Sequence, residues 1–189
     1  MDKTVGMAKT SASGSFHLFL GKLISTVILG IGTIILGAYI QEQELGLFTV
    51  ALIPSVTLLL FQDLGVGLAI TKYCAEYIGS KKEEKLRGLI QVGVSFNVVT
   101  GILLTIISLV SANFIAPSIF GKPEASLLIL VASFAIFFIA LLAASQSIFF
   151  GFERMKFATY TMISQAIVQA VLSPLLVYFG YGAMGAVIG

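Results

Sequence analysis

Long, uninterrupted apolar runs restrict the fold of this chain more than any other feature of the sequence. Residues 16–40, 88–113 and 125–150 each exceed the roughly 20 residues that a helix needs to cross a bilayer. From Phe157 to Gly189 no residue is charged. Only 11% of the chain is charged, whereas about a quarter is usual in soluble domains. These runs predict an all-α membrane protein, a polytopic bundle of transmembrane helices.

Charged or turn-rich stretches divide the apolar sequence into six expected spans, of which the last is short. The spans are expected at about 16–40, 45–70, 88–113, 125–150 and 157–179, with a truncated sixth from about 183. Residues 1–15 are polar and contain several Ser and Gly, so we expect a disordered N-terminus there. The run 16–40 is too long for a signal-peptide core and is expected to remain as the first span.

The basic residues predict the orientation of these spans. If the N-terminus is cytoplasmic, nine basic residues fall in cytoplasmic segments and one, Lys122, falls outside. The nine are Lys3, Lys9, Lys72, Lys81, Lys82, Lys85, Arg87, Arg154 and Lys156. Because basic residues concentrate in cytoplasmic loops, we expect a multi-pass protein of the cell membrane with its N-terminus in the cytoplasm.

The sequence offers little chemistry for catalysis. One cysteine, Cys74, and one histidine, His17, allow neither an internal disulfide nor a metal-binding cluster. No Ser/His/Asp arrangement or pair of carboxylates suggests an enzyme. The basic residues lie in short loops, so we expect membrane lipid as a partner and no nucleic acid. We expect no cofactor.

Two ionisable side chains, Lys22 and Asp63, fall inside the expected spans. Counted along their helices, both lie on the order of 10 Å from the cytoplasmic surface. Spans one and two are joined by four residues and are expected to be neighbours, which would allow Lys22 and Asp63 to pair. Two other interpretations stay open. Lys22 could extend its ammonium to the surface, or span two could end at Phe61, because Gly65 and Gly67 permit a break there.

Small and polar residues recur at helical spacing along two spans. On span one they are Lys22, Thr26, Gly30, Thr33 and Gly37, and on span five they are Thr161, Gln165, Gln169 and Ser173. Glutamines that faced lipid would be costly, so the second stripe must face protein or water. The stripes are expected either to pack helices together or to line a water-filled cavity. Pro54 and Pro174 are expected to kink their spans.

Three stretches resemble the Wzx-like polysaccharide-biosynthesis flippases of the multidrug/oligosaccharidyl-lipid/polysaccharide exporter superfamily. They are ELGLFTVALIPSVTLLLFQDLGVGLAITKYCAEY, GFERMKFATY and YFGYGAMGAVIG. In that family an E-x-G-x-F entry to the second helix precedes a D-x-G segment, and here these correspond to Glu44, Gly46 and Phe48, then Asp63 and Gly65. A G-x-x-R/K loop after the fourth helix corresponds to residues 151–156, and the basic loop is 72–87.

The resemblance implies a transporter that moves a polyprenyl-diphosphate-linked oligosaccharide across the membrane by alternating access. The chain resembles the N-terminal six-helix lobe of such a MATE-like fold. It is expected to need a C-terminal lobe or a second chain and not to transport alone. The expected substrate-binding residues are Lys22, Asp63, Gln165 and Gln169. The substrate diphosphate would displace Asp63 from Lys22 and bind the lysine as a point charge.

Two other functions fit the same residues. A cation-coupled multidrug antiporter of the same superfamily would use Asp63 to carry a proton or a sodium ion. A membrane scaffold that transports nothing would use both polar stripes for packing alone. Lys22, the one deep cation, favours an anionic substrate.

Overall fold

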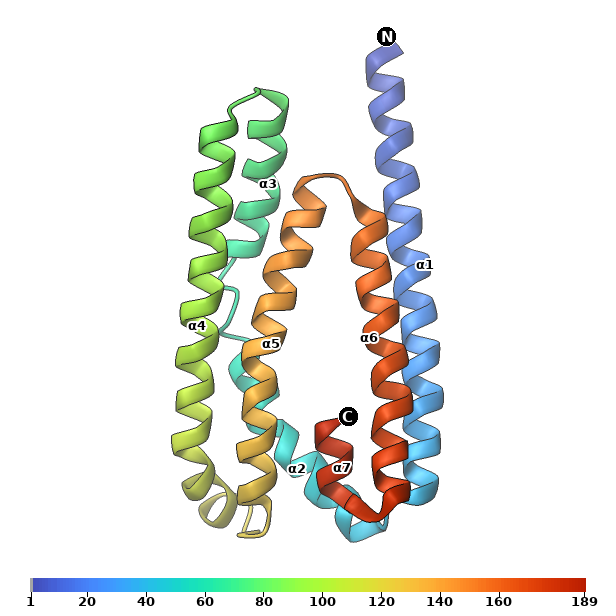
Figure 1. Ribbon diagram of the computed structural model, residues 1–189, viewed down its shortest axis with the longest axis vertical. Helices are drawn as coiled ribbons and strands as arrows, with labels where there is room; N and C mark the ends of the chain where they lie inside the picture. Colours follow the sequence, from blue (N-terminus) through green and yellow to red (C-terminus); the bar gives the residue numbers. More distant parts are fainter. Residues whose placement is uncertain (1) are drawn as a thin grey trace.

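Helices alternate in direction along the chain, and every regular element among the described residues is helical (Figure 1). The computed structural model describes residues 2–189, with side chains from Gly14 onward. The helices are α1 (Asp2–Tyr39), α2 (Glu42–Leu59), α3 (Val66–Gly79), α4 (Glu83–Ser118), α5 (Ala125–Gly151), α6 (Met155–Leu176), η1 (Val177–Tyr181) and α7 (Gly182–Ile188). The expected all-α class is confirmed.

Five helical segments of the described chain are long and apolar enough to cross a membrane, by length and composition. They are Gly14–Tyr39, Glu42–Leu59, Glu83–Ser118, Ala125–Gly151 and Met155–Ile188. The chain is therefore a multi-pass membrane protein. The last segment contains a break, since Gly180 has a φ of 90° inside η1. This break turns the chain back, and the seven residues of α7 follow it.

The N-terminus differs from its expected disorder, because α1 begins at Asp2. Extending an existing helix adds one backbone hydrogen bond per residue without a new nucleation cost. The residues before Phe16 include Met, Ala and Lys, which favour helix. Composition alone identified a polar segment, but continuity with the apolar helix decides its conformation.

The expected second span, 45–70, is divided into two helices. α2 ends at Leu59, and α3 begins at Val66 after a turn in which Leu64 and Gly65 have φ values of 44° and 85°. Glycine adopts positive φ at little cost, which permits the chain to leave the helix here. Of the alternatives for this span, the structure has the break after Phe61.

Helix α4 is longer than expected, with 36 residues instead of the 26 of 88–113. Its length of about 54 Å exceeds the roughly 30 Å of hydrocarbon in a bilayer. Together with α3 it forms a hairpin that extends beyond the α5–α6 loop at the end of the bundle where α1 begins (Figure 1). The basic residues of 72–87 belong to this hairpin.

Spans one and two do not pack side by side as expected, and they meet only where Phe48 contacts the cluster of Leu36 and Ile40. Helix α1 packs mainly on α6, whereas α2 packs on α5 and α7. In Figure 1, α2 runs obliquely away from the end of α1. Small residues explain why α1 packs on α6. A Cβ at Gly21 would lie 2.5 Å from Thr159 Cγ2, and a Cβ at Gly32 would lie 2.6 Å from Ala170 Cα. The two backbones therefore approach closely, as small residues permit in membrane helices.

Two clusters of buried apolar residues lie at the end of the bundle opposite the N-terminus. One cluster joins α2, α4, α5 and α7 through Ala51, Ala112, Ala116, Ala125, Leu128, Ile129 and Ala183. A smaller cluster joins Leu36, Ile40, Val177 and Ala186. Phe48 of α2 packs against both clusters. This packing holds α1, α2, η1 and α7 together at one end and positions the groove described next.

Candidate functional site

A polar groove runs between α1 and α6. Its larger hollow has a volume of about 310 Å³ and is lined by Lys22, Ser25, Thr26, Leu29, Met162, Gln165, Ala166 and Gln169. A smaller hollow of about 70 Å³ is lined by Leu29, Gly32, Thr33, Leu36, Phe48, Gln169, Ala170 and Ser173. The two hollows share Leu29 and Gln169. We call them together the α1–α6 groove.

The polar stripe of α1 does not form the contact with α6. Lys22, Thr26 and Thr33 are exposed and line the groove. Gly30 and Gly37, which continue the stripe, face open space. The buried face of α1 is instead formed by Gly21, Ser25, Gly32 and Leu36. Of the two interpretations of this stripe, the structure favours the wall of a cavity over helix packing.

The α6 stripe carries two free amides into the same groove. Gln165 and Gln169 are exposed, and within the described part of the chain neither side chain has a hydrogen-bond partner. They lie about 15 and 21 Å from the start of α6, at the depth of the hydrocarbon. An amide at that depth needs water, a ligand or another protein segment to satisfy it. The groove therefore offers donors and acceptors to a polar occupant.

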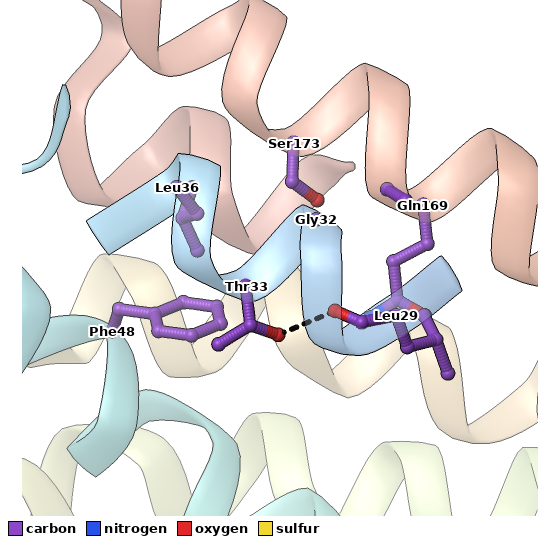
Figure 2. A pocket seen from close by; sticks show the side chains of 8 residues that line it. Leu29, Gly32, Thr33, Leu36, Phe48, Gln169 and Ser173 are labelled. Carbon is purple, nitrogen blue, oxygen red and sulfur yellow. Dashed lines mark hydrogen bonds between the residues drawn. The ribbon is translucent and has the colours of Figure 1, made fainter. Parts of the chain in front are cut away.

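The smaller hollow closes the groove toward the core (Figure 2). In this view the ring of Phe48 lies beside Thr33, and Ser173 and Gln169 approach from α6. The Thr33 hydroxyl donates to the Leu29 carbonyl at 2.8 Å. The volume falls from about 310 to 70 Å³ along the groove, so a bulky group fits only at the Lys22 end.

Lys22 is the one ionisable side chain among the residues that line the groove. It is exposed on α1, and no ion pair to it occurs within the described residues. Helix α1 reaches beyond Lys22 by more than five turns toward the N-terminus. The groove therefore has a positive charge at one end and uncharged amides along its wall. This arrangement suits an occupant that carries an anionic group next to polar, uncharged groups.

The expected pairing of Lys22 with Asp63 is wrong. Asp63 lies in the turn between α2 and α3, where its Oδ1 accepts a hydrogen bond from the Gly67 N–H at 2.6 Å. The side chain stands beside Ser147 of α5, since a Cβ at Gly67 would meet both. Asp63 does not line the groove. The pairing failed because it assumed that α1 and α2 are neighbours, whereas α1 packs on α6.

Asp63 instead stabilises the first turn of α3. The first N–H groups of a helix have no partner within it, and a carboxylate there also interacts favourably with the helix dipole. Two further contacts fix the break. The Gln62 amide donates to Asn97 Oδ1 at 2.7 Å, and the Thr71 hydroxyl lies 3.1 Å from the Ser147 carbonyl. Gln62 was missed in the sequence because its position inside a presumed continuous span gave no signal.

Residues of the sequence motifs lie at contacts that hold the helices in place. A side chain at Gly182 would collide with the Glu44 carboxylate, and a Cβ at Gly151 would collide with Cys74. Cys74 is fully buried, and this burial raises the pKa of its thiol. Several residues of the motifs that indicated the family therefore hold helices together and do not line the α1–α6 groove.

A multi-pass helical bundle with a polar groove at hydrocarbon depth is typical of membrane transporters. The fold is that of the MOP superfamily transporters. A MOP superfamily transporter from Pyrococcus furiosus Vc1 (DSM3638) is similar with a TM-score of 0.76 and 22% identity, over 95% of this chain and 40% of that one. A multidrug resistance MATE family transporter in an outward-facing conformation is similar with a TM-score of 0.71 and 20% identity, over 92% and 40%.

Sequence comparison identifies the family. Residues 11–189 match the family described as polysaccharide biosynthesis protein, and the chain belongs to it. The resemblance seen in the sequence is thus confirmed. The probable multidrug resistance protein YoeA of Bacillus subtilis (strain 168) is 25% identical over 190 residues, which cover 94% of this chain and 41% of that protein. The chain spans about two fifths of the length of these relatives.

Proposed function

We propose that this chain forms one lobe of a flippase for polysaccharide biosynthesis. The flippase would move a polyprenyl-diphosphate-linked oligosaccharide across the cell membrane, and the α1–α6 groove would contact its head group. Membership of the polysaccharide biosynthesis protein family supports the substrate class. The N-terminus would lie in the cytoplasm, as the distribution of basic residues indicates.

The observation that carries this proposal is the charge of the groove. Lys22 is its one ionisable lining residue and has no ion pair within the described chain. Placing an ammonium within the hydrocarbon costs about 2.5–3.5 kcal/mol on insertion scales, so a group that compensates it is expected. A diphosphate would supply that compensation as a contact to a point charge. Gln165 and Gln169 would hydrogen-bond the polar atoms beside the diphosphate.

The groove is bounded by this chain along α1 and α6 and, at its narrow end, by Phe48 of α2. Its relatives are more than twice as long, and a second lobe or a second chain would complete the site. Membrane lipid would contact the remaining surface, where α4 exposes Val99, Leu103, Ile106 and Val110.

A drug antiporter of the same superfamily is a weaker candidate, although two relatives bear multidrug names. A cationic substrate or a coupling ion would need an acid in the groove. Asp63, the acid considered for this role, accepts a hydrogen bond from Gly67 in the α2–α3 turn. A scaffold without transport is also disfavoured, because packing alone would leave no reason for free amides on Gln165 and Gln169.

Binding of a simple lipid diphosphate tests the proposal. Tritium-labelled farnesyl diphosphate should bind the chain in nanodiscs, as measured by scintillation proximity. Lys22→Ala should abolish binding, and Lys22→Arg should retain part of it because the positive charge remains. Lys72→Ala is the matched control, since Lys72 is exposed on α3 outside the groove. Unchanged binding by Lys22→Ala, or equal loss in Lys72→Ala, contradicts a head-group contact at Lys22.

A further inference from the structure

Two hydroxyl groups in the described chain are buried without a hydrogen-bond partner, on Ser25 and Ser55. Ser25 of α1 is 8% exposed and Ser55 of α2 is 5% exposed. A buried polar group without a partner destabilises the fold, so it calls for an explanation at each position. The two serines differ in one respect: Ser25 lines the larger hollow of the groove, and Ser55 lines neither hollow.

Ser25 also differs from the threonines of its own helix. The hydroxyls of Thr26 and Thr33 donate to the carbonyls of Lys22 and Leu29, each at 2.8 Å. Such bonds to the residue four positions earlier are the usual solution for hydroxyls in helices. Ser25 does not make this bond, so its hydroxyl proton is uncommitted.

Lys22 and Ser25 stand three residues apart and are neighbours along α1, with Lys22 on its exposed stripe and Ser25 at the edge of its buried face. Both line the 310 Å³ hollow, opposite Met162, Gln165 and Ala166 of α6, none of which is charged. An ammonium and a hydroxyl at this spacing supply a charge and a directed hydrogen bond to a single group. An anion with several acceptor oxygens, such as a diphosphate, accepts both.

We propose that Ser25 is a second contact for the anionic head group and donates its hydroxyl to a phosphate oxygen beside Lys22. This inference rests on the proposed function and names a further residue of the same site. The Ser25 Oγ is covered in the present structure, so the proposed contact requires a rotation about χ1 to another staggered position that brings the hydroxyl into the hollow that Ser25 lines. The unpaired hydroxyl lowers the stability of the empty lobe and is satisfied when the anion arrives.

Ser25→Ala and Ser55→Ala form a matched pair for testing this contact. Each removes one buried, unpaired hydroxyl, so each should raise the Tm, by about 2–4 °C per kcal/mol gained. The Kd for tritium-labelled farnesyl diphosphate in nanodiscs should weaken about tenfold in Ser25→Ala, which corresponds to ~1.4 kcal/mol and is close to the lower limit for a hydrogen bond to a charged group. It should not change in Ser55→Ala.

Competitors identify the recognised group. Inorganic pyrophosphate should displace the label from the wild-type chain, with a smaller effect on Ser25→Ala, and neutral farnesol should not. Displacement by farnesol alone would show that the prenyl chain is recognised and would overturn the proposal.

Two results separate this inference from the proposed function. If Lys22→Ala loses binding and Ser25→Ala binds as tightly as the wild type, the Ser25 contact is wrong and the head-group site stands. If the wild-type chain does not bind farnesyl diphosphate, both are wrong. A lowered Tm in Ser25→Ala would show that the hydroxyl already has a partner, which also contradicts the inference.

Discussion

Gly30 and Gly32 of α1 are separated by one residue but have different surroundings. A Cβ at Gly30 would meet nothing within 4 Å, whereas a Cβ at Gly32 would lie 2.6 Å from both Cα and Cβ of Ala170. In the sequence, both positions are simply small residues on an apolar helix. The contact with α6 alone decides which of them must be glycine.

Alanine should therefore be less favourable for stability at Gly32 than at Gly30. Both substitutions gain the same helix propensity, about 1 kcal/mol. Gly32→Ala also forces α1 away from α6, which should cost about 1–3 kcal/mol. Thermal unfolding in detergent should give a lower Tm for Gly32→Ala than for Gly30→Ala. Equal Tm values would contradict the close approach of the two helices.

At the scale of elements, the turn between α2 and α3 shows how a polar residue stabilises a broken span. Asp63 accepts from Gly67, and Gln62 bonds to the buried Asn97 of α4. The Asp63 carboxylate thus replaces a backbone acceptor for the Gly67 N–H, and the Gln62–Asn97 bond ties the turn to α4. A carboxylate within an apolar stretch thus has a structural role here, separate from the groove.

The stability lost on substituting Asp63 should depend on how much of its contact with Gly67 the new side chain keeps. Asp63→Ala leaves the Gly67 N–H without its acceptor and should cost about 1 kcal/mol. Asp63→Asn keeps an acceptor oxygen but loses the charge at the helix N-terminus, which should cost about 0.3–1 kcal/mol. Thermal unfolding checks the order. In a double-mutant cycle, the effects of Lys22→Ala and Asp63→Ala on the free energy of unfolding should be additive within ~0.5 kcal/mol. A larger coupling energy would indicate that the two side chains form an ion pair after all.

At the scale of the whole molecule, the basic loops gather at one end. The α3–α4 and α5–α6 loops lie at the end where α1 begins, and the α1–α2 and α4–α5 connections lie at the other (Figure 1). The first end carries Lys81, Lys82 and Arg154, and the second carries Lys122. This asymmetry underlies the proposed cytoplasmic N-terminus.

Cysteine labelling of intact cells should establish this topology. Ser118→Cys, at the end of α4 near Lys122, should react with an impermeant maleimide, and Ser80→Cys, at the end of α3, should react only after permeabilisation. Both positions are exposed. Native Cys74 should remain silent, because it is buried and its raised pKa lowers the fraction of reactive thiolate at any pH. Labelling in the reverse pattern would invert the proposed orientation.

The sequence by itself determined the class of protein, four of the spans to within several residues, and the family, but it left the break in the second span undecided. Hydrophobic runs determine insertion into a membrane because that cost is set residue by residue along one helix. The sequence also placed Lys22 on one polar stripe and Gln165 and Gln169 on another, since the spacing of polar residues on one helix follows from helical geometry.

Tertiary structure alone decided which helices are neighbours. It placed α1 against α6 instead of α2, brought Lys22 together with Gln165 and Gln169, and separated Lys22 from Asp63. It also left the Ser25 hydroxyl without a partner at the edge of the groove. These outcomes depend on how closely two backbones can approach, as Gly21 and Gly32 permit at α6. Complementarity between two surfaces distant in sequence is not encoded in the periodicity of either helix.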